Sequence, residues 1–147
     1  MVNLKFMKKY KNCITYGTFD LFHYGHGRLI RRIDKYCENL IVGISTDEFN
    51  KLKNKKAFDN YLIRSENILN SHPIVKKVVK EINWEQKIND IKDYKIDCFI
   101  MGSDWKGKFD FLNNYCDVIY LSRTPFISST YLRSKKMQED VDLKKNT

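Results

Sequence analysis

Short apolar runs alternate with segments of helical periodicity along most of this chain, and few folds accommodate such an alternation. The apolar runs predict strands at residues 12–16, 40–44, 74–79, 98–101 and 118–121. The intervening patterns predict helices at residues 26–36, 61–70, 83–94 and 110–115, and further helices that begin near residues 45 and 128. Alternating elements place parallel strands in one sheet with helices on both faces. We therefore expect a doubly wound α/β fold with a parallel five-stranded sheet.

The length of 147 residues fits one domain with a core of its own. We expect residues 1–11 to be an N-terminal extension, residues 12–137 the folded domain, and residues 138–147 a flexible polar tail. No stretch approaches the roughly 20 apolar residues of a membrane span, and the N-terminus lacks an apolar run of signal-peptide length. The expectation is a cytoplasmic protein without membrane insertion.

A formal net charge of +9 indicates an acidic partner. A nucleotide, a phosphorylated metabolite, a nucleic acid or an anionic lipid would each satisfy that charge. The four cysteines are widely separated and form no C-x-x-C pair, so neither a zinc site nor a disulfide framework is expected. We predict four buried thiols.

The loop between the first predicted strand and the next helix reads GTFDLFHYGH, residues 17–26. Its two histidines, His23 and His26, are three residues apart at a helix start, so their side chains can point the same way. A phosphate held there would meet backbone N–H groups and the positive end of the helix, and Gly25 permits close approach. Nucleotidyl transfer needs such donors where charge develops at phosphorus. A single histidine would more often be structural, but this spacing and location favour function.

Two further segments could supply groups that bind phosphate. Residues 123–130, RTPFISST, follow the fifth predicted strand and open the last predicted helix with three hydroxyls near Arg123. One hydroxyl would suffice for an N-cap. Lys53 and Lys55 follow the second predicted strand, at the same sheet edge as the first loop. Taken alone, these lysines and Lys87 would be read as solvated surface.

The run GTFDLFHYGH matches the GxFDxxHxGH signature of the cytidylyltransferase family, within the HxGH nucleotidyltransferase superfamily, and RTPFISST resembles its second signature, RTxGISTT. Between them, GISTDEFNKLKNKKA, NWEQK and IMGSDWKGKFDFL resemble the glycerol-3-phosphate cytidylyltransferases. The resemblance implies a Rossmann-like homodimer. It also implies that the enzyme makes CDP-glycerol and pyrophosphate from CTP and sn-glycerol 3-phosphate, with Mg²⁺ held through the nucleotide phosphates.

The same resemblance implies roles for individual residues. His23 and His26, assisted by Lys55 and Arg123, would stabilise the charge at the α-phosphorus. Lys53 and Lys87, with Arg64 as a second-rank candidate, would hold the acceptor. Nucleotide binding would involve all four of those catalytic candidates together with Thr18, Phe19, Tyr24, Gly25, Asp104, Thr124, Ile127, Ser128, Ser129 and Thr130.

Some residues depart from the family pattern, and two alternative functions remain open. Phe126 stands where the second signature has glycine, and residues 71–77 lack the Arg and Asp usual in that segment. The first alternative is a transferase of the same superfamily that uses ATP, another polyol phosphate or phosphocholine. The second is a noncatalytic nucleic-acid-binding domain that uses the +9 charge.

Overall fold

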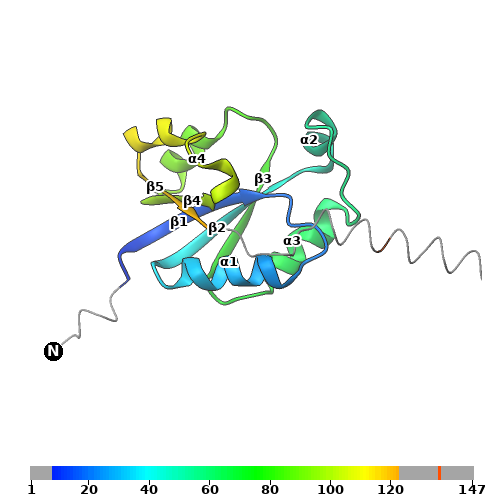
Figure 1. Cartoon of the computed structure of the whole chain (residues 1–147), viewed down its shortest axis with the longest axis horizontal. Helices are drawn as coiled ribbons and strands as arrows, with labels where there is room; N and C mark the ends of the chain where they lie inside the picture. Colours follow the sequence, from blue (N-terminus) through cyan, green and yellow to red (C-terminus); the bar gives the residue numbers. More distant parts are fainter. Residues whose placement is uncertain (1–7, 123–135, 137–147) are drawn as a thin grey trace, which may run out of the picture.

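A five-stranded parallel sheet organises the part of the chain that the structure, a computed structural model, describes: residues 8–122 and Lys136 (Figure 1). The strand order is β3-β2-β1-β4-β5. Their bounds are β1 (Tyr10–Gly17), β2 (Cys37–Ser45), β3 (Val75–Glu81), β4 (Cys98–Gly102) and β5 (Asp117–Leu121). The predicted fold and all five predicted strands are confirmed. Because β1 begins at Tyr10, the end of the predicted N-terminal extension belongs to the sheet.

Helices cover both faces of this sheet, as Figure 1 shows. On one face, α1 (Tyr24–Asp34) and α3 (Tyr61–Leu69) bury Ile30, Ile33 and Ile68. On the other face, α4 (Lys87–Asp93) and the 3₁₀ helix η3 (Asp110–Asn114) bury Ile91 and Leu112. The short α2 (Asp47–Leu52) and the 3₁₀ helix η2 (Ser103–Trp105) follow β2 and β4. No helix within the described residues is long and apolar enough to span a bilayer.

In the central strand β1, four consecutive residues, Cys13 to Tyr16, are buried, so side chains on both faces of this strand pack against a core. Cys13 and Ile14 pack into the two opposite cores. Cys13, Cys37 and Cys98 are free buried thiols, as predicted. The prediction was wrong for Cys116, which is free but only half-buried because it lies in the loop that leads into the edge strand β5.

Two predicted helices differ from the structure. The helix predicted at residues 83–94 begins only at Lys87, because the Gln86 side chain accepts the N–H groups of Ile82 and Asn83 and holds the preceding residues in a turn. The helix predicted at residues 110–115 is the 3₁₀ helix η3, too short for a regular α-helix. The helix predicted from residue 128 and the predicted tail lie outside the described residues.

Strand order reverses between β1 and β4, so the crevice outside their carboxyl ends is where an open α/β sheet binds its ligand. The loop after β1, the segment after β2 and the η2 segment after β4 all begin at that edge.

Candidate active site

A cleft of about 600 Å³ lies at this edge of the sheet. It is lined by residues from the end of β1 and its loop, α1, α2 and the following loop, the end of β3, and the segment after β4. It therefore brings together side chains that are far apart in the sequence. The predicted site residues that line it are Thr18, Phe19, His26, Lys53, Lys55, Lys87 and Asp104.

The two histidines of the first loop form the N-terminal cap of α1. His23 is the N-cap, and its Nδ1 accepts the Gly25 N–H at 3.0 Å. His26 Nδ1 accepts the His23 N–H at 3.3 Å, which completes a capping box. The rings stack with centroids 3.6 Å apart. A nitrogen that accepts a backbone N–H carries no proton, so each neutral ring is protonated at Nε2 and keeps that N–H as its donor.

Both imidazoles are neutral at physiological pH. Burial lowers the pKa of His26 to about 3, and the neighbouring His23 lowers it further, against a smaller opposing effect of Asp20. Burial also lowers the pKa of His23. Phe19 packs edge-on against the His26 ring with centroids 5.2 Å apart. Its ring is part of the apolar surroundings that lower the pKa of His26. The pair therefore offers N–H donors rather than cations to a phosphate.

A cluster of two lysines around one carboxylate forms another wall of the cleft. Lys87 Nζ lies 2.8 Å from Glu81 Oε2, and Lys53 Nζ lies 3.7 Å from Glu81 Oε1. Ser45 Oγ donates to Glu81 Oε1 at 2.9 Å and accepts from Lys53 Nζ at 2.8 Å. Positive charge is thus held in a fixed arrangement beside the cleft.

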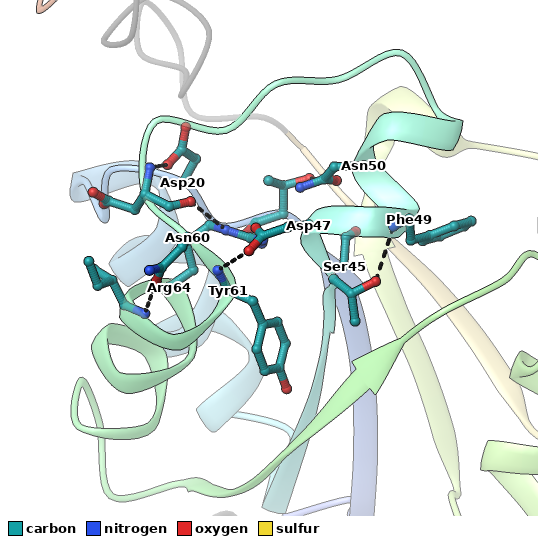
Figure 2. Close-up of polar contacts among 12 residues, drawn as sticks. Asp20, Ser45, Asp47, Phe49, Asn50, Asn60, Tyr61 and Arg64 are labelled. Atoms are coloured by element: carbon teal, nitrogen blue, oxygen red, sulfur yellow. Dashed lines mark hydrogen bonds and ion pairs between the residues drawn. The ribbon is translucent and has the colours of Figure 1, made fainter.

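The loop after β1 is held by a polar network behind the cleft (Figure 2). The buried Asp20 carboxylate accepts the N–H groups of Phe58 and Asp59 at 2.7 and 2.9 Å. Phe19 and Leu21 have φ values of 52° and 50°, in the left-handed region that non-glycine residues rarely adopt. Figure 2 shows Asp20 beside the segment that leads into α3. These bonds are among those that hold the loop in its unusual conformation.

Arg64 is a structural member of this network and does not line the cleft. Its guanidinium donates to the carbonyl oxygens of Thr18 at 2.8 Å and Asp59 at 3.0 Å, and to Asp47 Oδ1 at 2.8 Å (Figure 2). Burial by itself would raise the pKa of Asp47. The hydrogen bond from the Tyr61 N–H and the charge of Arg64 outweigh this effect, so the pKa of Asp47 lies below its usual value. Arg64 is fully buried and committed to three protein oxygens, so the structure does not bring it to the cleft where an acceptor would bind.

The remaining predicted residues fall into two groups. The residues from His23 to Gly25 do not line the cleft, although the His23 ring stacks on that of His26, which does. Tyr24 is 63% exposed and stacks on Arg31, and the Gly25 N–H fixes His23. Predicted residues that lie outside the described residues are Arg123, Thr124, Ile127, Ser128, Ser129 and Thr130.

Sequence reasoning did not find Glu81, Ser45 or the role of Asp20. The predicted third strand stopped at Val79, whereas β3 continues to Glu81, which pairs in register with Ser45 at the end of β2. A strand extended by two residues would have placed this carboxylate at the ligand edge. Asp20 lies inside the GTFDLFHYGH motif, so its position was a signal that sequence reasoning could have used.

The switch-point cleft, its N–H donors and its lysines define an α/β domain that binds phosphorylated ligands. Residues 14–135 match the sequence profile described as cytidylyltransferase-like. The chain belongs to this cytidylyltransferase-like family.

Individual relatives agree with that family. The chain is 55% identical over 123 residues to the glycerol-3-phosphate cytidylyltransferase of Bacillus spizizenii, a match covering 84% of this chain and 95% of that protein. It is 46% identical over 130 residues to the enzyme of that name from Staphylococcus aureus, covering 88% and 98%. The structure is similar to a crystal structure of the lipopolysaccharide core biosynthesis protein from Thermoplasma volcanium, with a TM-score of 0.66 and 18% sequence identity. The match covers 78% of this chain and 98% of that one, and at this identity it shows the fold alone.

Proposed function

We propose that this chain is an enzyme that transfers the cytidylyl group of CTP to sn-glycerol 3-phosphate, giving CDP-glycerol and pyrophosphate. The observation that carries this proposal is the 46–55% identity to glycerol-3-phosphate cytidylyltransferases over nearly their whole length. The cleft supports it, since the neutral His26 ring and the lysines Lys53, Lys55 and Lys87 line one space. The relatives do not favour the alternative of a noncatalytic nucleic-acid-binding domain.

The proposed reaction is one direct displacement. A phosphate oxygen of glycerol 3-phosphate forms a bond to the α-phosphorus of CTP. The bond from that phosphorus to the bridging oxygen breaks, and this oxygen leaves with its electron pair as part of pyrophosphate. A phosphate monoester is largely ionised near neutral pH, so the attacking oxygen needs no strong general base.

We assign His23 and His26 to the α-phosphate. Their Nε2–H groups would donate to the oxygens that gain negative charge, with Lys55 alongside, and Thr18 and Phe19 would shape the space around the nucleotide. Since capping bonds fix the rings before substrate arrives, little reorganisation is needed during the reaction. Arg123 and the hydroxyl run at residues 128–130 are proposed to hold the triphosphate.

We assign Lys53 and Lys87 to the acceptor phosphate, because both line the cleft beside the loop that carries the histidines. Mg²⁺ is proposed to accompany the triphosphate and to neutralise part of its charge. Asp104 places a carboxylate in the lining of the cleft, and a carboxylate fits an ion that keeps most of its ligands as water and phosphate oxygen.

The active assembly is proposed to be a homodimer in the cytoplasm, supplying CDP-glycerol for a phosphate polymer of a bacterial envelope, such as a teichoic acid, or for a capsule. Support for the dimer comes from Leu62, Ile63 and Leu69 of α3, which are 44–63% exposed in the single chain. Exposed apolar side chains on one helix are the kind of surface that a second copy would cover.

The direct test is to identify the product by mass. We expect CTP, Mg²⁺ and glycerol 3-phosphate to give CDP-glycerol and pyrophosphate, with far less product from ATP, other polyol phosphates or phosphocholine. Turnover with ATP alone would contradict the proposed nucleotide. Preferential turnover of phosphocholine or another polyol phosphate would contradict the proposed acceptor.

A further inference from the structure

The Glu81 side chain joins three parts of the cleft wall. Glu81 ends β3, where its carbonyl oxygen accepts the Thr46 N–H at the start of α2. Its carboxylate reaches Lys53 at the end of α2 and Lys87 at the start of α4. One carboxylate thus fixes two lysines that come from different elements.

The buried surroundings of the two lysines require a negative charge such as the Glu81 carboxylate. Glu81 and Lys87 are each 5% exposed, and charges so well buried are stable only when they are paired. Lys87 Nζ lies 4.7 Å from the centre of the Tyr16 ring, and Lys53 Nζ lies 4.6 Å from that of Phe49. Aromatic rings favour the ammonium groups but cannot balance two of them in one place.

The cluster keeps an excess of positive charge and of donors. Two ammonium groups and one carboxylate leave a net charge of +1, by formal count. Each ammonium group has three N–H donors. The contacts with Glu81 and Ser45 occupy one donor of Lys87 and at most two of Lys53, so donors remain for a ligand in the cleft that both lysines line.

We propose that Glu81 is the positioning residue of the acceptor subsite, holding the ammonium groups of Lys53 and Lys87 in place so that they receive the phosphate dianion of a phosphate monoester. This inference rests on the proposed function and deepens it. Before substrate binds, Glu81 offsets the repulsion between the lysines, and the arriving phosphate then meets donors that are already in place.

A pH effect accompanies this arrangement. Burial lowers the pKa of Lys53, and the neighbouring Lys55 and Lys87 lower it further, whereas Glu81 raises it. Removing the Glu81 charge leaves only the lowering effects. Lys53 then loses its proton at a lower pH, so the alkaline fall in kcat/KM for the acceptor moves to lower pH.

The test compares Glu81→Gln with Glu85→Gln, which removes the same charge from an exposed side chain four residues away. For Glu81→Gln we expect the KM for glycerol 3-phosphate to rise on the order of 10-fold or more, the scale of a weakened hydrogen bond to a charged group. The KM for CTP should change by less than about 3-fold on this scale. The alkaline limb should shift to lower pH in this variant only, and Glu85→Gln should match the wild type.

An unchanged acceptor KM together with a superimposable pH profile would overturn the inference. If Glu81→Gln does not fold, Glu81→Asp carries the test, because it keeps the charge but is too short to reach both lysines. In that variant we expect a raised acceptor KM with the alkaline limb near its wild-type position. A wild-type acceptor KM in Glu81→Asp would equally overturn the inference.

A binding measurement separates this inference from the proposed function. Trp84 and Trp105 line the cleft, so inorganic phosphate can be titrated by tryptophan fluorescence without any turnover. If the wild type makes no CDP-glycerol, the proposed function fails. The inference then stands if Glu81→Gln binds phosphate on the order of 10-fold more weakly than the wild type and Glu85→Gln, and it fails if all three bind alike.

Discussion

The two histidines at the start of α1 use one ring nitrogen to cap the helix and leave the other for the proposed chemistry. Each Nδ1 accepts a backbone N–H of the first turn, and this leaves each Nε2–H as the donor. The spacing of three residues predicted that both rings face the same way. It did not predict the capping box or the depressed pKa of His26, which depend on the backbone conformation and on burial.

His26→Gln separates these two roles. Glutamine suits the third position of a capping box, so the start of α1 should persist, but the imidazole Nε2–H is lost. We expect kcat for CDP-glycerol formation to fall on the order of 10²- to 10³-fold, the scale for one transition-state donor. The third histidine gives a matched control, since His72→Gln changes a residue that does not line the cleft. Near-normal turnover in His26→Gln would refute the assigned role.

At the scale of elements, the loop after β1 depends on α3 for its conformation. Arg64 donates to the Thr18 carbonyl, and Asp20 accepts N–H groups from the segment before α3. The sequence placed Arg64 on a helix but gave no sign that the helix turns this side chain inward. Tertiary packing buries it behind the cleft, so a residue predicted to bind the acceptor instead holds the loop that carries Thr18.

We expect Arg64→Lys to destabilise the fold and weaken nucleotide use. A lysine keeps the charge, but its single ammonium cannot match the planar fork that reaches three oxygens. The loss should be about 2–4 kcal/mol in the free energy of unfolding, measured with urea, together with a higher KM for CTP. Arg31→Lys, at an exposed arginine, should change stability by less than about 0.5 kcal/mol. Equal stability of the two variants would show that the buried fork is dispensable.

For the whole molecule, the cleft exists only when the sheet is complete. Its walls come from segments after β1, β2, β3 and β4, and polar contacts between residues that are many positions apart, such as Thr18 with Arg64, hold these segments in place. A ligand that bridges these walls binds the folded state and not the unfolded chain. Nucleotide binding should therefore be visible as global stabilisation.

CTP should raise the melting temperature of the whole chain. At a concentration of about 100 Kd the stabilisation is about 2.7 kcal/mol, which corresponds to roughly 5–10 °C for a domain of this size. Cytidine, which lacks the phosphates, should cause a much smaller shift at the same concentration. The measurement is a thermal melt followed by circular dichroism. No shift with CTP, with or without Mg²⁺, would contradict a nucleotide site in this cleft.

The strands, their parallel arrangement and the position of the loop that carries the two histidines could all be predicted from the sequence alone. Central parallel strands must be apolar on both faces, and this leaves a pattern that a single sequence displays. GTFDLFHYGH is likewise local, because its histidines and the helix that they cap are consecutive in the chain. The sequence did not predict the turn before α4, because this turn depends on hydrogen bonds to the Gln86 side chain rather than on local backbone preference.

Which charged side chains reach the cleft, and which partners they meet there, depends on how distant segments pack in the folded chain. Glu81 joins Lys53 and Lys87 because β3 lies beside β2 and ends level with Ser45, and the sequence does not record that register. Burial, which changes the pKa of His26 and of Lys53, is likewise a property of the assembled fold. Chemistry that arises from contacts between distant segments cannot be derived from any one of them.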